Sequence, residues 1–507
     1  MKNQSPRYTK RRMFGLVAGP ALFCIMLAVP APAGMSPQAQ KTAALALLMA
    51  TWWLCESIPI AATSLLPVAL MPLLGIMHTK KAAAPYASHL IFLFMGGFII
   101  GLSMQRWNLH RRIAMHIVRA VGFSPKRLIL GFMIATAGLS AFVSNTATTI
   151  MMMPIGTAII VHVIEEAKRQ GRRTVRPENF PFALNLMLGI AYAASIGGMA
   201  TLIGTPPNTV LAGFLQKTYG FEITFFRWFL VGAPLACVML PLCWLWLTFV
   251  ANPVSLQRIP GGRDLIGREL RTLGPMSPGE RWTALVFCLT AVCWMLRPRI
   301  GFLFPDPALV TDGAIAVAGA LLLFLIPVNL KKSEFVMNWQ WAARLPWGIL
   351  VLFGGGLSLA SGFTATGLAD WIGAQAALLD QAPVVVLLVA VVVLIVFLTE
   401  LTSNTATAAM SMPVLAAVAL GIGQNPLLLL APAAIAASCA FMLPVATPPN
   451  AIVFASGYVD IPRMAKSGFG LNIIAITVVT LWAYMLMVPL FEIVLNRLPS
   501  WAVTFSG

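Results

Sequence analysis

The stretch Ser144-Asn-Thr-Ala-Thr-Thr-Ile-Met-Met-Met-Pro154 recurs later in the chain as Ser403-Asn-Thr-Ala-Thr-Ala-Ala-Met-Ser-Met-Pro413, with eight of eleven positions identical. Two further pairs flank it. Leu93-Phe94-Met95-Gly96-Gly97 matches Leu352-Phe353-Gly354-Gly355-Gly356 at the same spacing of 259 residues, and Thr205-Pro-Pro-Asn208 matches Thr447-Pro-Pro-Asn450 at a spacing of 242. Three motifs in the same order in both halves indicate a duplicated structural unit.

The composition places this unit in a bilayer. Of 507 residues, 59% are hydrophobic and only 10% are charged, which is not typical of a water-soluble protein of this size. Apolar runs of bilayer-spanning length predict about eleven transmembrane helices. They lie near 13–31, 40–54, 58–77, 91–105, 183–215, 225–251, 282–296, 313–329, 346–362, 426–458 and 470–494.

Charge placement predicts the orientation. The net charge is +18, but Lys and Arg fill short loops between apolar runs, which indicates the positive-inside pattern and no nucleic-acid partner. Five basic residues precede the first apolar run and predict a cytoplasmic N-terminus: Lys2, Arg7, Lys10, Arg11 and Arg12. The chain is therefore expected to be a multi-pass protein of the cell inner membrane.

The two Ser-Asn-Thr copies are predicted to enter the membrane from opposite sides. The first lies midway between Lys126-Arg127 and the basic cluster Lys168 to Arg173, so both ends of its run should be cytoplasmic. The second lies centrally in the run 382–423, whose flanks carry no Lys or Arg and should face outward. Each run predicts a re-entrant helical hairpin, and together they predict an inverted-topology repeat with substrate bound near the midplane. Lys80 and Lys81 do not fit this topology, because it places these two basic residues on the outer side.

The predicted fold is an all-α polytopic membrane protein with two re-entrant hairpins and two broken helices. Its expected organisation is a cytoplasmic N-terminus with the first transmembrane helix (1–34), a first inverted repeat (35–254), a cytoplasmic linker (255–281) and a second inverted repeat (282–507), which ends externally. The linker ends in Ser277-Pro-Gly-Glu280, a helix-start signal with a hydroxyl N-cap, a proline at the first position and a glutamate three residues after the cap.

The broken helices are predicted at the two Thr-Pro-Pro-Asn motifs, Thr205–Asn208 and Thr447–Asn450, because paired prolines remove backbone donors. In lipid the freed backbone groups are tolerated only beside protein or an aqueous cavity. Helix N-termini there, with nearby hydroxyls and amides, can donate to carboxylate oxygens, whereas carbonyl and hydroxyl oxygens suit Na⁺. The candidate donors are Ser144, Asn145, Thr146, Ser403, Asn404 and Thr405.

The core segments 128–161, 183–215, 383–423 and 426–458 contain no Lys or Arg. A dianion there would be uncompensated, because a helix terminus supplies only about half a charge. Two or more co-bound Na⁺ ions are therefore expected. Glu56 and Glu400 are the intramembrane acids, and such acids are functional by default, although Glu400 could equally brace the second hairpin tip.

With these paired motifs and Glu56-Ser-Ile-Pro59, the chain resembles the divalent anion:sodium symporter family along nearly its whole length. The resemblance implies a homodimer in which each protomer has a scaffold and an elevator-like transport domain. It implies one sodium site at Ser140, Ser144, Asn145 and the Gly204 carbonyl, and another at Thr399, Ser403, Asn404 and the Ala446 carbonyl. Thr399 stands where a serine is expected and keeps the hydroxyl. The expected substrate set is Ser144, Asn145, Thr146, Thr205, Ser403, Asn404, Thr405, Thr447 and Pro448.

The expected activity is import of C4-dicarboxylates (succinate, malate, fumarate) coupled to Na⁺. A sodium-independent exchanger of the same fold would need fixed positive charge at the site. A membrane-embedded enzyme would need a catalytic pair within the spans, and no such cluster is visible in the sequence. Seven cysteines without a Cys-x-x-Cys pair and five dispersed histidines argue against a zinc site. A passive channel remains a further alternative, but inverted hairpins favour alternating access.

Overall fold

The computed structural model describes residues 8–169, 180–256, 262–377 and 381–503, and these are almost entirely helical. The predicted flanking charges Lys2, Arg7, Arg172 and Arg173 lie outside these ranges. Within the described residues, ten helices are long and apolar enough to cross a membrane, close to the eleven expected. A short hairpin of β1 (Pro327–Asn329) and β2 (Glu334–Phe335) is the strand content of this part of the chain. The prediction of an all-α polytopic fold is confirmed.

The helices of the first half are α1 (Lys10–Ala28), α2 (Pro37–Cys55), α3 (Ile60–Thr63), α4 (Leu66–Leu73), α5 (Thr79–Ala83), α6 (His89–Arg106), α7 (Leu109–Val121), α8 (Pro125–Ser140), α9 (Asn145–Arg169), α10 (Pro181–Gly198), α11 (Pro206–Tyr219) and α12 (Phe225–Leu245). Those of the second half are α13 (Gly262–Thr272), α14 (Pro278–Gly301), α15 (Asp312–Leu325), α16 (Trp339–Ala342), α17 (Trp347–Thr366), α18 (Leu368–Ala376), α19 (Val384–Leu401), α20 (Asn404–Gly421), α21 (Leu427–Ala436), α22 (Pro448–Phe454), α23 (Ile461–Trp482), α24 (Val488–Leu490) and α25 (Ser500–Val503).

The helices begin where polar caps satisfy their free N–H groups. At the start of α14 the predicted capping box is present, because the Ser277 hydroxyl accepts from the Glu280 amide at 3.2 Å and Glu280 Oε2 accepts from the Ser277 amide at 2.7 Å. Thr9, Ser36 and Thr311 cap α1, α2 and α15 in the same manner, each accepting a bond from a backbone N–H.

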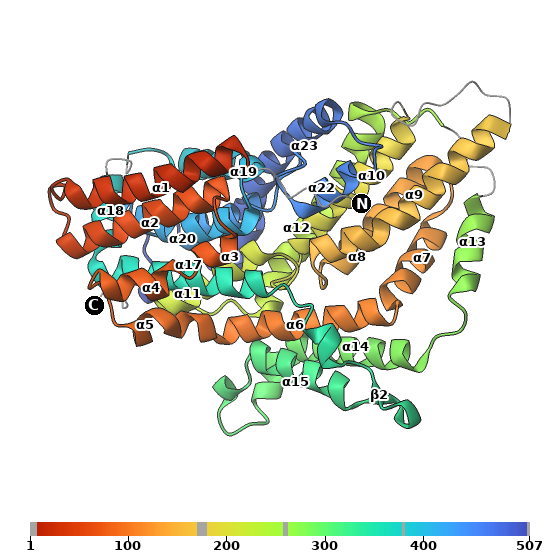
Figure 1. Cartoon of the computed structure of the whole chain (residues 1–507), viewed down its shortest axis with the longest axis horizontal. Coiled ribbons are helices and arrows are strands. Elements are labelled where there is room, and N and C mark those ends of the chain that lie inside the picture. Colours follow the sequence, from red (N-terminus) through yellow and green to blue (C-terminus); the bar gives the residue numbers. More distant parts are fainter. Residues whose placement is uncertain (1–7, 170–179, 257–261, 378–380, 504–507) are drawn as a thin grey trace.

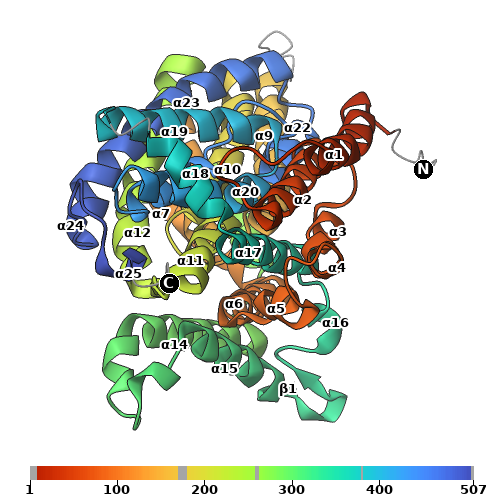
Figure 2. The same cartoon turned by 90° about the vertical axis from the view of Figure 1, so that its left-hand side faces the viewer.

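The glycine runs allow helices to pack in direct contact. A Cβ atom on Gly96 of α6 would lie 2.5 Å from the backbone carbon of Ala316 in α15, and one on Gly355 of α17 would lie 2.3 Å from the Ser64 carbonyl oxygen. Helices α14 and α15 thus form a layer directly against α6, seen at the bottom of Figures 1 and 2. The glycines serve packing, as small residues commonly do between membrane helices.

Both Ser-Asn-Thr motifs lie at turns between paired helices. The first follows α8 and opens α9, and the second follows α19 and opens α20. In Figure 1 the pair α8–α9 lies in the right half of the molecule and α20 in the left half. Hairpins centred on the repeated motif are therefore present, while their inverted membrane topology stays a prediction.

The region between the two repeats is more ordered than a simple linker. Residues 262–272 form α13, which lies beside α7 at the right of Figure 1. Arg111 of α7 pairs with Glu269 of α13. Arg112 donates from Nε to Glu280 Oε1 at 2.8 Å and from Nη1 to the Gly274 carbonyl at 3.0 Å. The predicted domain boundaries at 34, 254 and 281 stay predictions.

Candidate transport site

A single cavity of about 630 Å³ brings the repeat motifs together. It is lined by all nine residues expected to meet substrate: Ser144, Asn145, Thr146, Thr205, Ser403, Asn404, Thr405, Thr447 and Pro448. Further lining comes from the α2–α3 region, α6 and the start of α17, which contribute Glu56, Ile60, Ala61, Phe98, Pro346, Gly348, Ile349 and Leu352. Segments about 250 residues apart in sequence thus share one cavity.

Four helices begin at this cavity, each with a motif residue as its N-cap or first residue. Helices α9 and α20 start at Asn145 and Asn404, and the Ser144 hydroxyl accepts from the Ala147 amide at 3.3 Å. Helices α11 and α22 start directly after Thr205 and Thr447, whose backbones are extended. Free N–H groups at helix N-termini attract anions. Among the described residues lining the cavity none is Lys or Arg, so the helix ends are the part of the lining suited to attract an anion.

Behind the first hairpin tip lies a cluster of oxygen atoms. The Ser140 hydroxyl is 2.6 Å from Asn145 Oδ1 and 2.7 Å from the Ala194 carbonyl oxygen. The same end of the Asn145 amide is 3.2 Å from the Gly204 carbonyl and 3.0 Å from that of Ala194. Turned so that its nitrogen points this way, the Asn145 amide donates to the Ser140 hydroxyl and to both carbonyls.

The second hairpin tip repeats this arrangement. The Thr399 hydroxyl is 2.8 Å from Asn404 Oδ1 and 2.9 Å from the Ala437 carbonyl oxygen, which has the place that the Ala194 carbonyl has beside Ser140. Ala446 and Ser403 line the cavity beside it. Thr399 is fully buried, and its hydroxyl lies within hydrogen-bond distance of an asparagine amide and a backbone carbonyl, as that of Ser140 does.

The donor chemistry of both clusters fits Na⁺. Hydroxyl, amide and carbonyl groups converge at each tip: Ser140 lies beside the Asn145 amide and the Ala194 carbonyl, and Thr399 lies beside the Asn404 amide and the Ala437 carbonyl. A hard cation placed among hydroxyl, amide and carbonyl oxygens satisfies them together. In contrast, the described residues contain no group of three or more His, Cys, Asp or Glu side chains arranged to hold a metal.

The asparagines of the two Thr-Pro-Pro-Asn motifs stabilise the helix breaks, a role not foreseen from sequence. Asn208 donates to the carbonyls of Gly198, Met199 and Thr201, and Asn450 donates to those of Ala440 and Leu443. Both are fully buried. Each therefore satisfies carbonyls freed where a helix is interrupted, which is what lipid surroundings require. The sequence signal that could have indicated this role is the presence of the asparagine in both copies of the motif.

Glu400 braces the second break and does not line the cavity. Its carboxylate accepts from the amides of Phe441, Met442 and Leu443 at 2.7–3.2 Å and from Asn472 Nδ2 at 2.8 Å. Five such bonds leave little capacity for a ligand. Of the two readings that the sequence allowed, the structure favours bracing.

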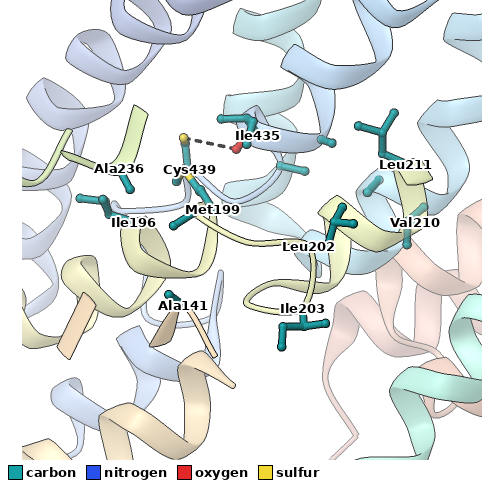
Figure 3. Close-up of a cluster of buried hydrophobic side chains, with 14 of the residues drawn as sticks. Ala141, Ile196, Met199, Leu202, Ile203, Val210, Leu211, Ala236, Ile435 and Cys439 are labelled. Carbon is teal, nitrogen blue, oxygen red and sulfur yellow. Dashed lines mark hydrogen bonds between the residues drawn. The ribbon is translucent and has the colours of Figure 1, made fainter. Parts of the chain in front are cut away.

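Apolar packing seals the space between the two breaks. Figure 3 shows Met199 of the first break beside Cys439 of the second, with Leu202, Ile203 and Ile435 in the same buried cluster and Cys439 Sγ donating to the Ile435 carbonyl at 3.4 Å. All five side chains are at least 97% buried. Tyr192 adds a hydrogen bond of 2.7 Å to the Phe441 carbonyl. The breaks are thus held as one packed unit behind the cavity.

Known proteins match nearly the full chain. The chain is 43% identical over 494 residues to the "Sodium-dependent dicarboxylate transporter SdcS" of Staphylococcus saprophyticus, covering 97% of this chain and 94% of the relative. It is 43% identical over 499 residues to the protein of the same name from Staphylococcus aureus, covering 98% and 95%.

Solved transporters share the fold at low sequence identity. The Alcanivorax borkumensis YdaH transporter matches with a TM-score of 0.55 and 14% identity, covering 87% of this chain and 97% of that one. Neisseria gonorrhoeae MtrF matches with a TM-score of 0.57 and 12% identity, covering 96% and 97%. At this identity the likeness concerns the fold alone.

The family model described as "Sodium:sulfate symporter transmembrane region" matches residues 10–493, which confirms the resemblance found in the repeat motifs. Because the relatives and the family are transporters, the alternative of a membrane-embedded enzyme is excluded. Because the family model and the relatives match nearly the whole chain, this protein belongs to the sodium:sulfate symporter family of membrane transporters.

Proposed function

We propose that this chain imports C4-dicarboxylates such as succinate, malate and fumarate together with two or more Na⁺ ions. The observation that carries the proposal is the pair of oxygen clusters behind a cavity that Lys and Arg do not line. Among the described residues, the cavity lining offers neutral donors to two carboxylates but no Lys or Arg side chain. Sodium ions in the two clusters would supply that charge within a few ångströms of the substrate, where electrostatic attraction is strong.

The asparagines at the hairpin tips couple the ions to the substrate. Asn145 and Asn404 each belong both to an oxygen cluster and to the cavity wall. When an ion holds the side-chain oxygen of such an amide, its nitrogen is directed away from the ion and is free to donate to a carboxylate. Ion binding thus orders the donors that the dianion needs, and the dianion in turn favours the bound ions by linkage.

Alternating access is proposed to occur by an elevator motion. The motif-bearing wall is one packed unit of both hairpins and both breaks, whereas α2–α3, α6 and α17 supply the further lining. A motif-bearing unit sliding along these helices would expose the cavity on either side. The remaining assignments are part of the same proposal: the inverted repeats, the homodimer, the inner-membrane location, the cytoplasmic N-terminus and the external C-terminus.

Uptake of radiolabelled succinate into proteoliposomes tests the function. We expect uptake with external Na⁺, little uptake when K⁺ replaces Na⁺, and no requirement for internal dicarboxylate. Inward current during uptake would show that more than two Na⁺ accompany each dianion. Equal uptake without Na⁺, seen only against internal dicarboxylate, would instead establish the exchanger. Competition by malate, fumarate, citrate and sulfate then ranks the substrates.

A further inference from the structure

Two arginines reach the edge of the transport cavity from outside its lining. Glu56, which belongs to the cavity lining, pairs with Arg12 Nη2 at 3.2 Å and with Arg11 Nη2 at 3.7 Å through the same oxygen, Oε2. Arg11 Nη1 also donates to the carbonyl of Leu401 at 2.8 Å, two residues before Ser403. We call Arg11, Arg12 and Glu56 the cavity-edge site.

Glu56 has an uncommon backbone conformation. It follows α2 in the left-handed conformation, with φ of 50°, which is rare for a residue other than glycine. The next residue, Ser57, accepts a hydrogen bond at its carbonyl from the Tyr8 hydroxyl. The start of α1 is therefore tied to the end of α2 at two neighbouring positions, and the guanidinium groups are kept beside the cavity.

The cavity-edge site has positive charge and donors to spare. Two guanidinium groups face one carboxylate, which leaves a net charge of +1, and the side chains remain 41%, 36% and 28% exposed for Arg11, Arg12 and Glu56. Each guanidinium carries five N–H donors, of which the described contacts use one or two. Exposed, paired charges of this kind exchange partners easily, because their net stabilisation is small.

We propose that the cavity-edge site is a transient docking site for organic carboxylates, at which one carboxylate of the dianion replaces Glu56 on Arg12 while passing between water and the cavity. The site lies at the start of α1, so it serves the passage on the side of the membrane where the N-terminus is predicted to lie. This proposal rests on the proposed transport of dicarboxylates. Glu56 then competes with the substrate carboxylate for the arginines, so that the substrate is not retained there.

A purely structural ion pair predicts a different pattern. If Arg12 and Glu56 only fasten α1 to α2, removing either partner breaks the same contact and should alter transport in the same direction. If they form a docking site, removing Arg12 weakens substrate capture, whereas removing the Glu56 charge strengthens it. The opposite signs of the two effects separate the alternatives.

The experiment measures dicarboxylate KM separately from each face, using right-side-out and inside-out vesicles that contain the full chain. Arg12 is the residue to change, because Arg11 also binds Leu401. At low ionic strength we expect Arg12→Gln to raise KM about threefold on the N-terminal face, and Glu56→Gln to lower it about threefold there. Both shifts should vanish in about 0.5 M choline chloride, which screens exposed charges. Arg12→Lys should restore most of the lost capture.

A matched control is Arg119→Gln, which removes an exposed charge from α7 away from the cavity and should leave KM unchanged. KM changes of the same sign for Arg12→Gln and Glu56→Gln would overturn the docking site, as would unchanged KM in both. If wild-type vesicles transport no dicarboxylate, the proposed function itself fails. If wild type transports and only the opposite signs are missing, the failure belongs to the docking site alone.

Discussion

Replacing Thr399 with valine tests the second sodium cluster most directly. The two side chains have nearly the same shape, and Thr399 is fully buried among oxygen atoms, so the change removes a hydroxyl without opening a cavity. The ion would lose one oxygen ligand, which is worth about 1.5–3 kcal/mol by analogy with hydrogen bonds to charged groups. In the ion-free protein the same change removes one hydrogen bond, worth about 0.5–1.5 kcal/mol.

The difference between these two losses sets the expected effect. A net weakening of about 1–1.5 kcal/mol corresponds to a five- to tenfold increase in the Na⁺ concentration for half-maximal uptake, since about 1.4 kcal/mol is tenfold. The assay is succinate uptake into proteoliposomes across a Na⁺ titration, with choline holding the ionic strength constant. At saturating Na⁺ the maximal rate should recover to near the wild-type value. Thr399→Ser, which keeps the hydroxyl, is the matched control and should stay close to wild type.

One outcome would refute this reasoning. If Thr399→Val left the Na⁺ dependence unchanged and raised succinate KM at saturating Na⁺, the hydroxyl would act on the substrate and the cluster would not be an ion site. A similar loss in Thr399→Ser would instead indicate that packing, not ligation, is responsible.

Three further predictions concern the same region. Gly198→Ala would place a Cβ atom 2.5 Å from Asn145 Oδ1 and should abolish Na⁺-stimulated uptake while surface expression, measured by labelling, persists. Glu400→Ala leaves the amides of residues 441–443 without their acceptor and should destabilise the protein by more than about 3 kcal/mol, seen as a lower melting temperature in detergent, with Glu400→Gln intermediate. Asn450→Leu frees two buried carbonyls at the second break and should lower both melting temperature and maximal uptake rate, whereas replacing the exposed Thr477 with alanine should change neither.

Much of the architecture was predictable from the sequence, because it follows from local chemistry. Paired prolines break a helix wherever they occur within an apolar run, and the breaks are found between α10 and α11 and between α21 and α22. Repetition of Ser-Asn-Thr and Thr-Pro-Pro-Asn predicted that both halves would contribute to one site, and the cavity contains all nine of the residues so identified.

The sequence could not assign roles to the acidic and amide side chains, because these depend on which backbone groups lie nearby. Glu56 and Glu400 are both carboxylates close to apolar runs, yet Glu56 lines the cavity and Glu400 binds the backbone of the second break. Nothing in their neighbouring residues distinguishes them. The partner amides of Glu400 lie more than 40 positions along the chain.

The sequence by itself determined where helices start, break and repeat, since caps, prolines and apolar runs act within a few residues. Only the tertiary structure decided that Ser140 and Thr399 each lie beside an asparagine amide and a distant backbone carbonyl, and that Arg11 and Arg12 reach the cavity edge. The physical reason is the range of the interactions. Helix signals are carried by adjacent peptide groups, whereas an ion cluster or a carboxylate docking site requires groups that are brought within about 4 Å of one another only by the packing of distant helices.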